Sequence, residues 1–384
     1  MKRVRIAPRA DWRETAAQFG FGFHTFDGEP YWDESAYYQF SLEQIERDLE
    51  DPTLEIHQMC LDLVARVVES EQLLERLAIP AAYHDLIRRS WKARQPHLYG
   101  RMDLSYDGHG PAKLLETNYD TPTSLYEASF FQYLWLDQQM QRGQLSPDCD
   151  QFNSLEEKLS ERFKAFRFKP PFHFSSIRGS IEDRGTVDYL RDIAHEAGLD
   201  TRMIAIEDIG LSNLGQFVDE QNAPINTLFK LYPWEHMFQE AFGPAIDQSG
   251  TQFVEPAWKA ILSNKGALAL LWELHEGHPN LLATYFDNDP TRPLDNGWVR
   301  KPFFSREGAN IEIRTDKGRR VYQGGPYGDG PCIRQRFHAL PCFDGNYTVI
   351  GSWMIGDQPA GIGIREDDSL ITMDTSRFLP HVIL

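Results

Sequence analysis

Two carboxylates and one amide lie near an arginine within residues 101–118, at a spacing that could hold a metal ion. Arg101 and Asp103 are two residues apart, and Glu116 and Asn118 have the same spacing. Because side chains alternate along a strand, a hairpin between the two segments would bring all four polar groups to one face. Carboxylate and amide oxygens suit Mg²⁺, and buried charges are costly unless they are paired or bind metal. A structural salt bridge from Arg101 to either carboxylate fits the same spacing, so both interpretations stay open.

Residues 298–310 combine a lysine with a loop of small residues. Lys301 interrupts an otherwise apolar predicted strand, 298–304, where its ammonium group needs an anionic partner. The sequence that follows, Ser-Arg-Glu-Gly-Ala-Asn, would allow backbone N–H groups to approach phosphate oxygens. Glu307 in this loop could add a carboxylate to a magnesium ion. Many surface hairpins have a similar sequence, so the pattern alone indicates a phosphate site only weakly.

Other charged positions have an ordinary explanation beside a functional one. Lys265 begins a predicted helix, where anions are favoured, although a lysine in a first turn is usually solvated. Glu182 and Asp183 also begin a helix, and the helix dipole alone accounts for carboxylates there. Lys230 interrupts an aromatic strand and has no such ordinary explanation. Arg365 ends a glycine-rich strand and could form a turn ion pair with the next residue.

Composition limits the function classes. The chain has 384 residues, 41% of them hydrophobic, and a formal net charge of −18. Nucleic acid is disfavoured as the main partner, because phosphate binding needs a cationic surface. A cationic substrate such as a polyamine or basic peptide is compatible with this charge, which could equally serve only solubility. The sequence lacks P-loop, dinucleotide-binding, zincin and nucleophile-elbow motifs.

The cysteines and the N-terminus indicate the cellular compartment in which the protein is expected. The four cysteines form no CxxC pair and are scattered, as expected of reduced thiols in a cytoplasm. The N-terminus is basic but has no apolar region of the kind a signal peptide needs. No stretch approaches the roughly 18 apolar residues of a membrane span. We therefore expect a cytoplasmic protein that does not act at a membrane.

Strand and helix patterns predict a mixed α/β protein that positions these groups. Apolar residues at helical spacing predict helices over 41–79 and 81–99, and another helix follows Thr123. A strand–helix–strand pattern over 172–206 predicts a small α/β layer. Short strands with glycine turns predict an antiparallel C-terminal sheet from 298–304, 309–314, 331–337, 346–355, 359–365 and 369–373. We expect one domain, 1–384, with candidate subdomains 1–145, 150–225 and 226–384.

Together these segments resemble the synthetase domain of the glutathionylspermidine synthase family, in the ATP-grasp superfamily. The likeness is greatest to short bacterial acid–amine ligase-like proteins without the amidase domain, and it runs from about Arg13 to the C-terminus. It rests on a specific order of motifs: Arg-Met-Asp at 101–103, Glu-Thr-Asn-Tyr-Asp-Thr-Pro-Thr-Ser at 116–124, Ile-Glu-Asp at 181–183, Asn-Lys at 264–265, Lys-Pro and its loop at 301–310, Gln335, Leu-Pro at 340–341, and Arg365. An ATP-grasp-like fold is what the resemblance implies.

The same resemblance implies an ATP-dependent ligase, in which ATP phosphorylates a carboxylate and an amine attacks the acyl phosphate to give an amide. Arg101 would be the catalytic residue that stabilises the transferring phosphoryl group. The loop 305–310 would close over the phosphates and exclude water. Magnesium, two ions by this resemblance, would be bound by Asp103, Glu116 and Asn118. The implied ATP-binding residues are Arg101, Lys265, Lys301, Ser305, Gly308, Asn310, Gln335 and Leu340, and the implied substrate-binding residues are Thr121, Thr123, Glu182, Asp183 and Arg365.

The sequence departs from the family pattern in three ways. The N-terminal amidase is missing, so hydrolysis of the product is not expected. Arg377 stands where an acidic residue is associated with the polyamine, which puts spermidine in doubt because a cation there would repel a cationic amine. Glu307 also differs from the family's loop and could be an extra metal ligand.

Two other function classes are compatible with these residues. One is a nucleotide- or polyamine-binding protein without turnover, although a binder needs no phosphoryl-stabilising arginine beside its metal site. The other is a metal-dependent phosphohydrolase, for which only His109, in a predicted turn, is a nearby histidine base. As partners we expect small-molecule or peptide acids and amines, with no nucleic acid and no membrane. The identity of the substrates and the oligomeric state are left open.

Overall fold

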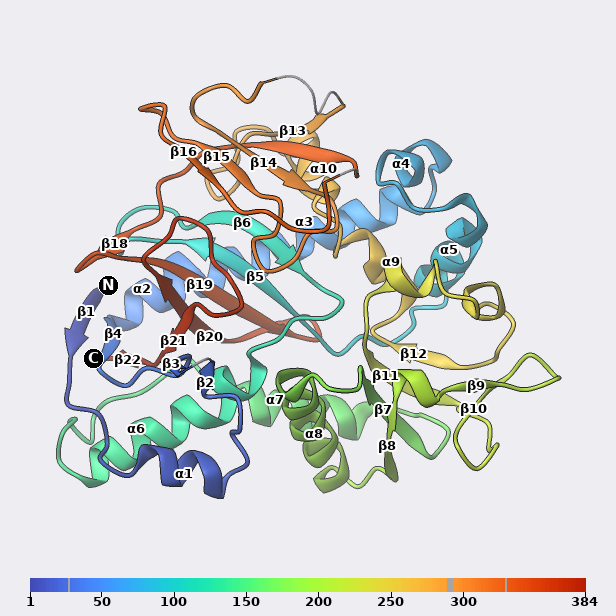
Figure 1. The fold of residues 1–384 in the computed structure, drawn as a ribbon, viewed down its shortest axis with the longest axis horizontal. Helices are drawn as coiled ribbons and strands as arrows, with labels where there is room; N and C mark the ends of the chain where they lie inside the picture. The colour runs from blue at the N-terminus through green and yellow to red at the C-terminus, as the bar shows by residue number, and fades with distance from the viewer. Residues whose placement is uncertain (27, 289–292, 329) are drawn as a thin grey trace.

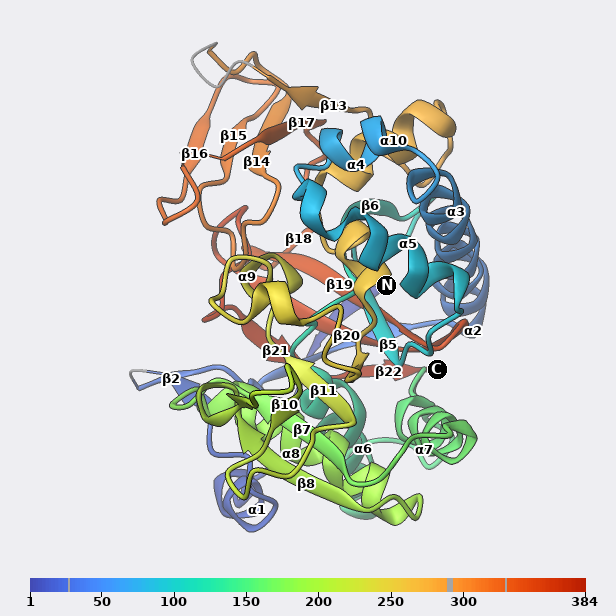
Figure 2. The ribbon, with the colours of Figure 1, turned by 90° about the vertical axis from the view of Figure 1, so that its right-hand side faces the viewer.

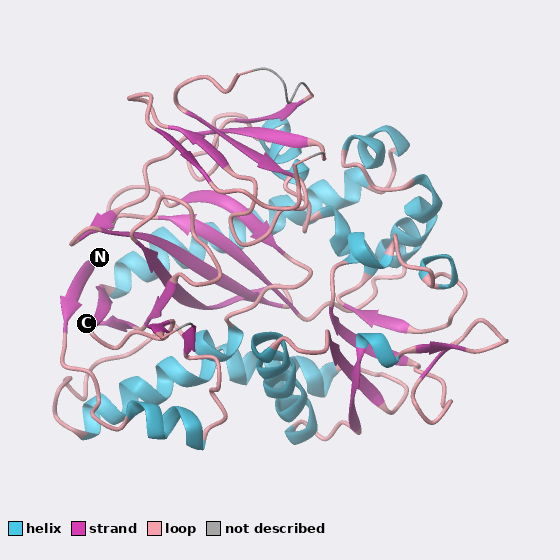
Figure 3. Ribbon diagram, viewed as in Figure 1, coloured by secondary structure: helices cyan, strands magenta, loops and turns pink. Residues whose placement is uncertain are grey.

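A computed structural model describes residues 1–26, 28–288, 293–328 and 330–384. Three large sheets follow one another through the molecule: a five-stranded sheet at the top of Figure 1, a six-stranded sheet in the middle and a parallel sheet at the lower right. The side view in Figure 2 has the same order from top to bottom. Figure 3 shows helices mainly along the lower and right-hand sides. The predicted mixed α/β class is confirmed.

The central six-stranded sheet carries the predicted hairpin. Arg101 pairs with Asn118, and Asp103 pairs with Glu116, in antiparallel register. All neighbouring strands of this sheet are antiparallel. Its strands are β5 (Tyr99–Ser105), β6 (Lys113–Asn118), β18 (Cys342–Phe343), β19 (Asn346–Ile355), β20 (Gln358–Asp367) and β21 (Arg377–Leu379), in the order β21-β20-β19-β5-β6 with β18 on β19.

The second antiparallel sheet carries Lys301. Its strands are β13 (Thr284–Asp287), β14 (Trp298–Pro302), β15 (Glu312–Arg314), β16 (Arg320–Tyr322) and β17 (Cys332–Arg336), in the order β13-β17-β14-β15-β16. The C-terminal strands therefore divide between two sheets, because β19 pairs with β5, far away in the sequence. The strand predicted at 369–373 is wrong. There, side-chain oxygens of Asp367, Ser369 and Ser376 accept hydrogen bonds from backbone N–H groups, which forms turns.

The third sheet confirms the predicted strand–helix–strand unit. Its strands are β7 (Phe172–Ser176), β8 (Thr201–Ala205), β11 (Thr227–Leu231) and β12 (Gln252–Val254), all parallel and in the order β12-β11-β7-β8. The chain leaves β7 through α8 (Ile181–Glu196) and enters β8 on one side, whereas β11 lies on the other side. Such a reversal of strand order leaves a crevice at the carboxyl ends of the strands.

The predicted N-terminal helices are shorter than expected. Residues 41–79 form four helical segments, beginning at the capping box of Ser41 and Gln44. The helix predicted at 81–99 ends at Lys92, because Arg94 has a positive φ of 50° and the chain then enters β5. The helices are α1 (Trp12–Gln18), α2 (Leu42–Ile45), a π-helix (Glu46–Glu50), α3 (Asp51–Val67), α4 (Glu71–Arg76), α5 (His84–Lys92), a π-helix (Glu127–Phe131), α6 (Gln132–Gln141), α7 (Leu155–Ala165), α8, α9 (Trp234–Met237) and α10 (Gly266–Leu274), with short 3₁₀ helices at Ala81–Tyr83, Ile206–Asp208, Gly243–Ala245 and Ala257–Ile261.

A small three-stranded sheet joins the two chain ends. In it β4 lies between β1 and β22, so the two termini lie near each other (Figure 1). The remaining strands are β1 (Lys2–Arg5), β4 (Ala36–Phe40), β22 (His381–Ile383), β2 (Thr25–Phe26), β3 (Glu29–Pro30), β9 (Gly210–Leu211) and β10 (Phe217–Val218). Two large clusters of buried apolar side chains form the core. Among the described residues, no helix is long and apolar enough to cross a membrane.

Candidate active site

The hairpin of β5 and β6 brings the four predicted polar groups together. Arg101 Nε donates to Asp103 Oδ1 at 2.6 Å, and its Nη2 donates to Oδ2 at 3.1 Å. The Asn118 amide nitrogen lies 3.2 Å from an oxygen of Asp103 and 3.4 Å from one of Glu116. Arg101 also donates to the backbone oxygen of Thr123 at 2.7 Å. The ion pair of Arg101 with Asp103 and the cluster of oxygen ligands therefore occur together, so the two interpretations of the sequence do not exclude each other.

Two lysines approach this cluster from other elements. Lys265, just before α10, places its Nζ 3.2 Å from Glu116 Oε2 and also donates to the backbone oxygen of Ser305. Lys301 on β14 donates to the backbone oxygen of Leu115 and to Gln335 Oε1, both at 2.8 Å. Strands from two sheets and one helix start thus converge on one region.

The charges of this region shift the ionisation of its members. Burial alone would raise the pKa of Glu116, but Lys265, Lys301 and Arg101 overcome that effect and hold its pKa at about 2. Burial raises the pKa of Asp103 despite the opposing charge of Arg101. Burial lowers the pKa of Lys301 to about 8, although Glu116 favours its charged form. Glu116 is therefore an anion at neutral pH, available to a cation.

A cavity of about 400 Å³, here called the catalytic cavity, contains most of the predicted site residues. A smaller cavity of about 100 Å³ adjoins it, since both are lined by Asp103, Glu116 and Gly308. The predicted residues that line the catalytic cavity are Arg101, Asp103, Glu116, Asn118, Thr121, Thr123, Glu182, Asp183, Lys265, Ser305, Gly308 and Arg365. Lys301, Gln335 and Leu340 line the smaller cavity, whose other walls are largely apolar. The smaller cavity has the mixed lining expected for a flat base beside phosphates.

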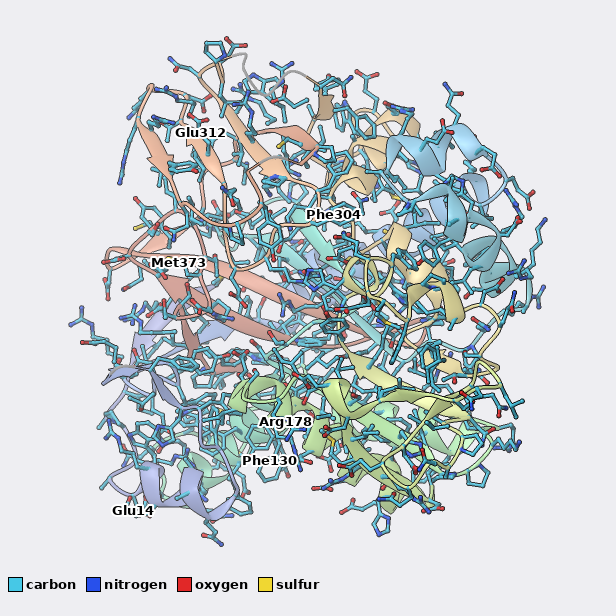
Figure 4. All side chains as sticks on the ribbon, turned by 45° about the vertical axis from the view of Figure 1, so that its right-hand side comes forward. Glu14, Phe130, Arg178, Phe304, Glu312 and Met373 are labelled. Carbon is cyan, nitrogen blue, oxygen red and sulfur yellow. The ribbon has the colours of Figure 1, made fainter. Side chains whose placement is uncertain are left out.

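The loop 305–310 rests on the segment that was wrongly predicted as a strand. Gly308 has a φ of +71°, and a Cβ atom there would collide with the side chain of Ile371. Arg306 reaches to α9 and pairs with Glu235 at 2.6 Å. The contacts with Ile371 and with Glu235 hold the loop against the cavity on two sides. Figure 4 labels Phe304 and Met373, which line the catalytic cavity, and Arg178, which follows the lining residue Ile177.

A group of carboxylates lines one part of the catalytic cavity: Glu182, Asp183, Glu307 and Asp374. Burial, together with the charge of Glu127, raises the pKa of Glu182 to about 7. Burial also raises the pKa of Asp183 and of Glu307, the latter with repulsion from Asp374. Burial is the main cause in each case, and the nearby cations Arg306 and Arg365 do not offset it.

Two residues singled out in the sequence lie outside the cavities. Asn310 lines neither one, and its side-chain oxygen accepts a hydrogen bond from the backbone of Tyr327 at 2.7 Å. Arg377 also lines neither and donates to Glu366 at 3.0 Å and to Asn346 at 2.6 Å. Arg377 is therefore not part of the wall of either cavity.

Some cavity residues were not anticipated from the sequence. Asp120, Tyr232, His236, Arg306, Tyr327 and Asp374 line the catalytic cavity. Asp120 lies two residues beyond Asn118, so continuing the alternation of the strand would have indicated it. Lys230, whose place in an aromatic strand was unexplained, pairs with Asp120 at 2.5 Å. His236 lies on the short helix α9, and the other residues come from loops, which carry no periodic signal.

The oxygen atoms of Asp103, Glu116 and Asn118 would supply only some of the ligands that a hard cation needs. Among the described residues, no group of three His, Cys, Asp or Glu side chains is positioned to hold a metal. The hairpin offers two carboxylates and one amide, without nitrogen or sulfur ligands from His or Cys. Mg²⁺ is commonly bound in this way, by one or two carboxylates with substrate phosphates and water completing the octahedron. The residues present therefore fit Mg²⁺ that arrives with a nucleotide.

Comparison with known proteins gives a family for the chain. The model of the family described as "Glutathionylspermidine synthase preATP-grasp" matches residues 3–384. A Haemophilus influenzae protein named "Putative acid--amine ligase" is 39% identical over 99% of both chains. The Escherichia coli bifunctional glutathionylspermidine synthetase/amidase is 26% identical over 91% of this chain and 59% of its own length. The Crithidia fasciculata trypanothione synthetase is 27% identical over 83% of this chain and 52% of its own.

The chain thus spans only about half to three fifths of the two longer relatives. The family and these relatives are named as ligases, so the predicted enzyme class is confirmed, as is the predicted resemblance. Among solved structures, a glutathione synthetase-like effector from Globodera pallida matches with a TM-score of 0.53 at 12% identity, covering 91% of this chain and 89% of that one. That likeness concerns the fold alone and agrees with the predicted ATP-grasp-like fold.

Proposed function

Because the chain belongs to the glutathionylspermidine synthase preATP-grasp family, we propose that it is an ATP- and Mg²⁺-dependent ligase that joins a carboxylate to an amine through an acyl phosphate. The observation that carries this proposal is the convergence of Arg101, Lys265 and Lys301 on the carboxylates of one hairpin. Three cations beside an ionised carboxylate match the needs of a metal–nucleotide complex.

The two cavities would bind different parts of the metal–nucleotide complex. Lys301, Gln335 and Leu340 would bind the nucleotide, with its base between the apolar walls of the smaller cavity. Lys265 and the loop 305–310 would contact its phosphates. Asp103, Glu116 and Asn118 would hold the metal, which supplies charge neutralisation when it is bound. The number of metal ions, two by resemblance, depends on whether Glu307 also takes part.

Arg101 is the residue that would act in the chemical steps. A carboxylate oxygen of the acid would attack the γ-phosphorus of ATP, releasing ADP and leaving an acyl phosphate. The amine nitrogen would then attack the acyl carbon, phosphate would leave with the C–O bond electrons, and the nitrogen would lose a proton. Negative charge develops on oxygen in both steps, so a half-buried guanidinium beside these atoms would lower both barriers. The covering loop would exclude water, which otherwise hydrolyses the acyl phosphate.

The carboxylates of the catalytic cavity support a cationic amine as the second substrate. Glu182, Asp183, Glu307 and Asp374 lie together, and three of them have a raised pKa. A second ammonium group on the amine would relieve their mutual repulsion. Arg377 does not oppose this, because it lies outside the cavity and pairs with buried Glu366. A diamine or polyamine therefore fits better than a neutral amine.

The proposal is tested by measuring ADP release from Mg-ATP against a matrix of acids and amines, with mass spectrometry of the products. Glutathione, short peptides and amino acids serve as acids, and polyamines, diamines and amino acids serve as amines. ADP that appears only with a particular pair, together with an adduct lighter than the pair by one water, supports the ligase. Mg-ATP binding without turnover across the matrix would instead favour a nucleotide- or polyamine-binding protein.

A further inference from the structure

An apolar pocket of about 400 Å³ adjoins the catalytic cavity. Its walls include Ile246 and Phe253, both buried, and Phe242, which is 40% exposed. No local sequence pattern predicts this pocket, because its walls come from β10, β12 and the loops around α9 as well as from β11. An exposed phenylalanine beside an open apolar volume is a feature of sites that receive an apolar group.

Two side chains connect this pocket to the catalytic cavity. Ile177 follows β7, Tyr232 follows β11, and both residues line both cavities. The strands β7 and β11 are adjacent and parallel, so these residues lie side by side at their carboxyl ends. This is also the point at which the strand order reverses, where open α/β sheets commonly bind ligands. Ile177 and Tyr232 therefore separate the two volumes, and a molecule that occupied both would pass between or over these side chains.

The charges at the pocket indicate which substrate extends into it. Glu207 and Glu240 line the pocket, and Glu240 accepts a hydrogen bond from the Tyr232 hydroxyl at 2.6 Å. Lys230 is the cation that lines it, and its ammonium is already paired with Asp120. A carboxylate near this pocket would meet repulsion, whereas an ammonium group would be attracted. The carboxylate cluster of the catalytic cavity would likewise attract an ammonium group and repel a carboxylate.

We propose that the amine substrate carries an apolar group, aryl or branched alkyl, which the pocket binds while the amino groups lie in the catalytic cavity. This inference rests on the proposed function and makes it more specific, because a simple diamine would leave the pocket unused. The pocket then discriminates between amines by the apolar surface that they bury. Full burial of a group of phenylalanine size favours binding by roughly 10- to 100-fold over an amine that lacks it.

Calorimetry with two probes of similar charge, 1,4-diaminobutane and N-benzyl-1,4-diaminobutane, tests this. Ala241→Trp fills the pocket from an exposed position that does not line the catalytic cavity. Ala82→Trp is the matched control, because Ala82 is also exposed and lines neither cavity. We expect the benzyl probe to bind wild type and Ala82→Trp at least about tenfold more tightly than the parent diamine, and Ala241→Trp to lose this difference.

Three outcomes would overturn the inference. The first is equal affinity for the two diamines, and the second is an unchanged preference in Ala241→Trp. The third is a benefit for 4-phenylbutyrate over butyrate that Ala241→Trp removes, since it would assign the pocket to the acid. Binding is measured without turnover, so these results are distinct from failure of the ligase proposal, which the ADP-release assay reports. An active ligase with no benzyl preference would refute only the inference about the pocket.

Discussion

Lys230 and Asp120 form an ion pair in which both side chains are fully buried, with Nζ 2.5 Å from Oδ1. Asp120 also accepts a hydrogen bond from the backbone N–H of Trp234 at 2.9 Å, and Lys230 donates to the backbone oxygen of Tyr232 at 2.9 Å. Asp120 lines the catalytic cavity, whereas Lys230 lines the apolar pocket. The pair therefore fixes the wall between the two and ties β11 to the end of the β6 segment.

Replacing Lys230 with Met should destabilise the protein strongly, because it leaves the Asp120 carboxylate buried without its cation. Loss of one partner of such a pair costs about 3–5 kcal/mol of unfolding free energy. Urea denaturation followed by tryptophan fluorescence measures this. The double variant Lys230→Met/Asp120→Asn should recover a large part of the loss, because no uncompensated charge remains. A double variant that is no more stable than the single one would contradict this account.

Arg101→Ala should abolish turnover but spare nucleotide binding. In the proposed reaction the guanidinium would lie where negative charge develops, and removing one such group typically costs roughly 10²- to 10³-fold in kcat. ADP release and Mg-ATP calorimetry measure the two properties separately. Arg377→Ala is a matched control, because Arg377 also pairs with a carboxylate but lines neither cavity. Full activity in Arg101→Ala would exclude the role assigned to it.

Glu116→Ala should weaken the magnesium-dependent part of ATP binding. Glu116 is the carboxylate whose pKa lies at about 2, so it offers a full negative charge to the metal at neutral pH. We expect the magnesium concentration needed for half-maximal ATP binding to rise by at least about tenfold. A magnesium titration at fixed ATP measures this. An unchanged titration would remove Glu116 from the metal site.

The sequence could predict the hairpin because its signal is local. Alternation placed Arg101, Asp103, Glu116 and Asn118 on one face of a hairpin, and the structure pairs these residues on β5 and β6. The division of the C-terminal strands could not be predicted in this way. β19 pairs with β5 across about 250 residues of chain, and no local pattern states which distant strand is a partner.

The same limit applies to the candidate site. Lys230 was recognisably out of place in an aromatic strand, but its partner Asp120 is 110 residues away. Residues 369–373 look like a strand because they are apolar and follow a strand. Their apolar side chains Leu370 and Ile371 instead pack against the five-stranded sheet, and side-chain oxygens take up the neighbouring backbone donors. Competition of this kind between side chains and strand pairing leaves no periodic signal.

ATP affinity should fall as the pH rises through about 8. Burial lowers the pKa of Lys301 to about 8, so its ammonium is charged below that pH and neutral above it. Phosphate oxygens bind the charged form, and binding must therefore draw in a proton at higher pH. In Lys301→Arg the guanidinium stays charged, and the fall should disappear. Calorimetry of Mg-ATP binding from about pH 7 to about pH 9.5 measures the dependence of affinity on pH for both proteins. Identical profiles for the two proteins would show that Lys301 does not face the phosphates.

Affinity for a diamine should rise as the pH increases through about 7, because of Glu182. Burial and the charge of Glu127 raise the pKa of Glu182 to about 7, so the carboxylate is neutral below that pH and anionic above it. The ammonium groups of 1,4-diaminobutane stay charged in this range, since amines of this kind ionise near pH 10. Glu182→Gln should therefore bind the diamine weakly at all pH values and lose the rise. Glu196→Gln, an exposed change on the same helix, is the control and should keep it.

The same residue makes an opposite prediction for stability, which separates recognition from a structural role. The folded-state pKa of Glu182 exceeds its ordinary value, so the unfolded chain binds fewer protons between the two values. Stability is consequently lost as the pH rises toward 7, and Glu182→Gln should be more stable than wild type at pH 8 or so in urea denaturation. If Glu182 binds the amine, Glu182→Gln should be more stable than wild type and should bind the diamine less tightly. A variant that loses both stability and affinity would instead mark Glu182 as a structural group.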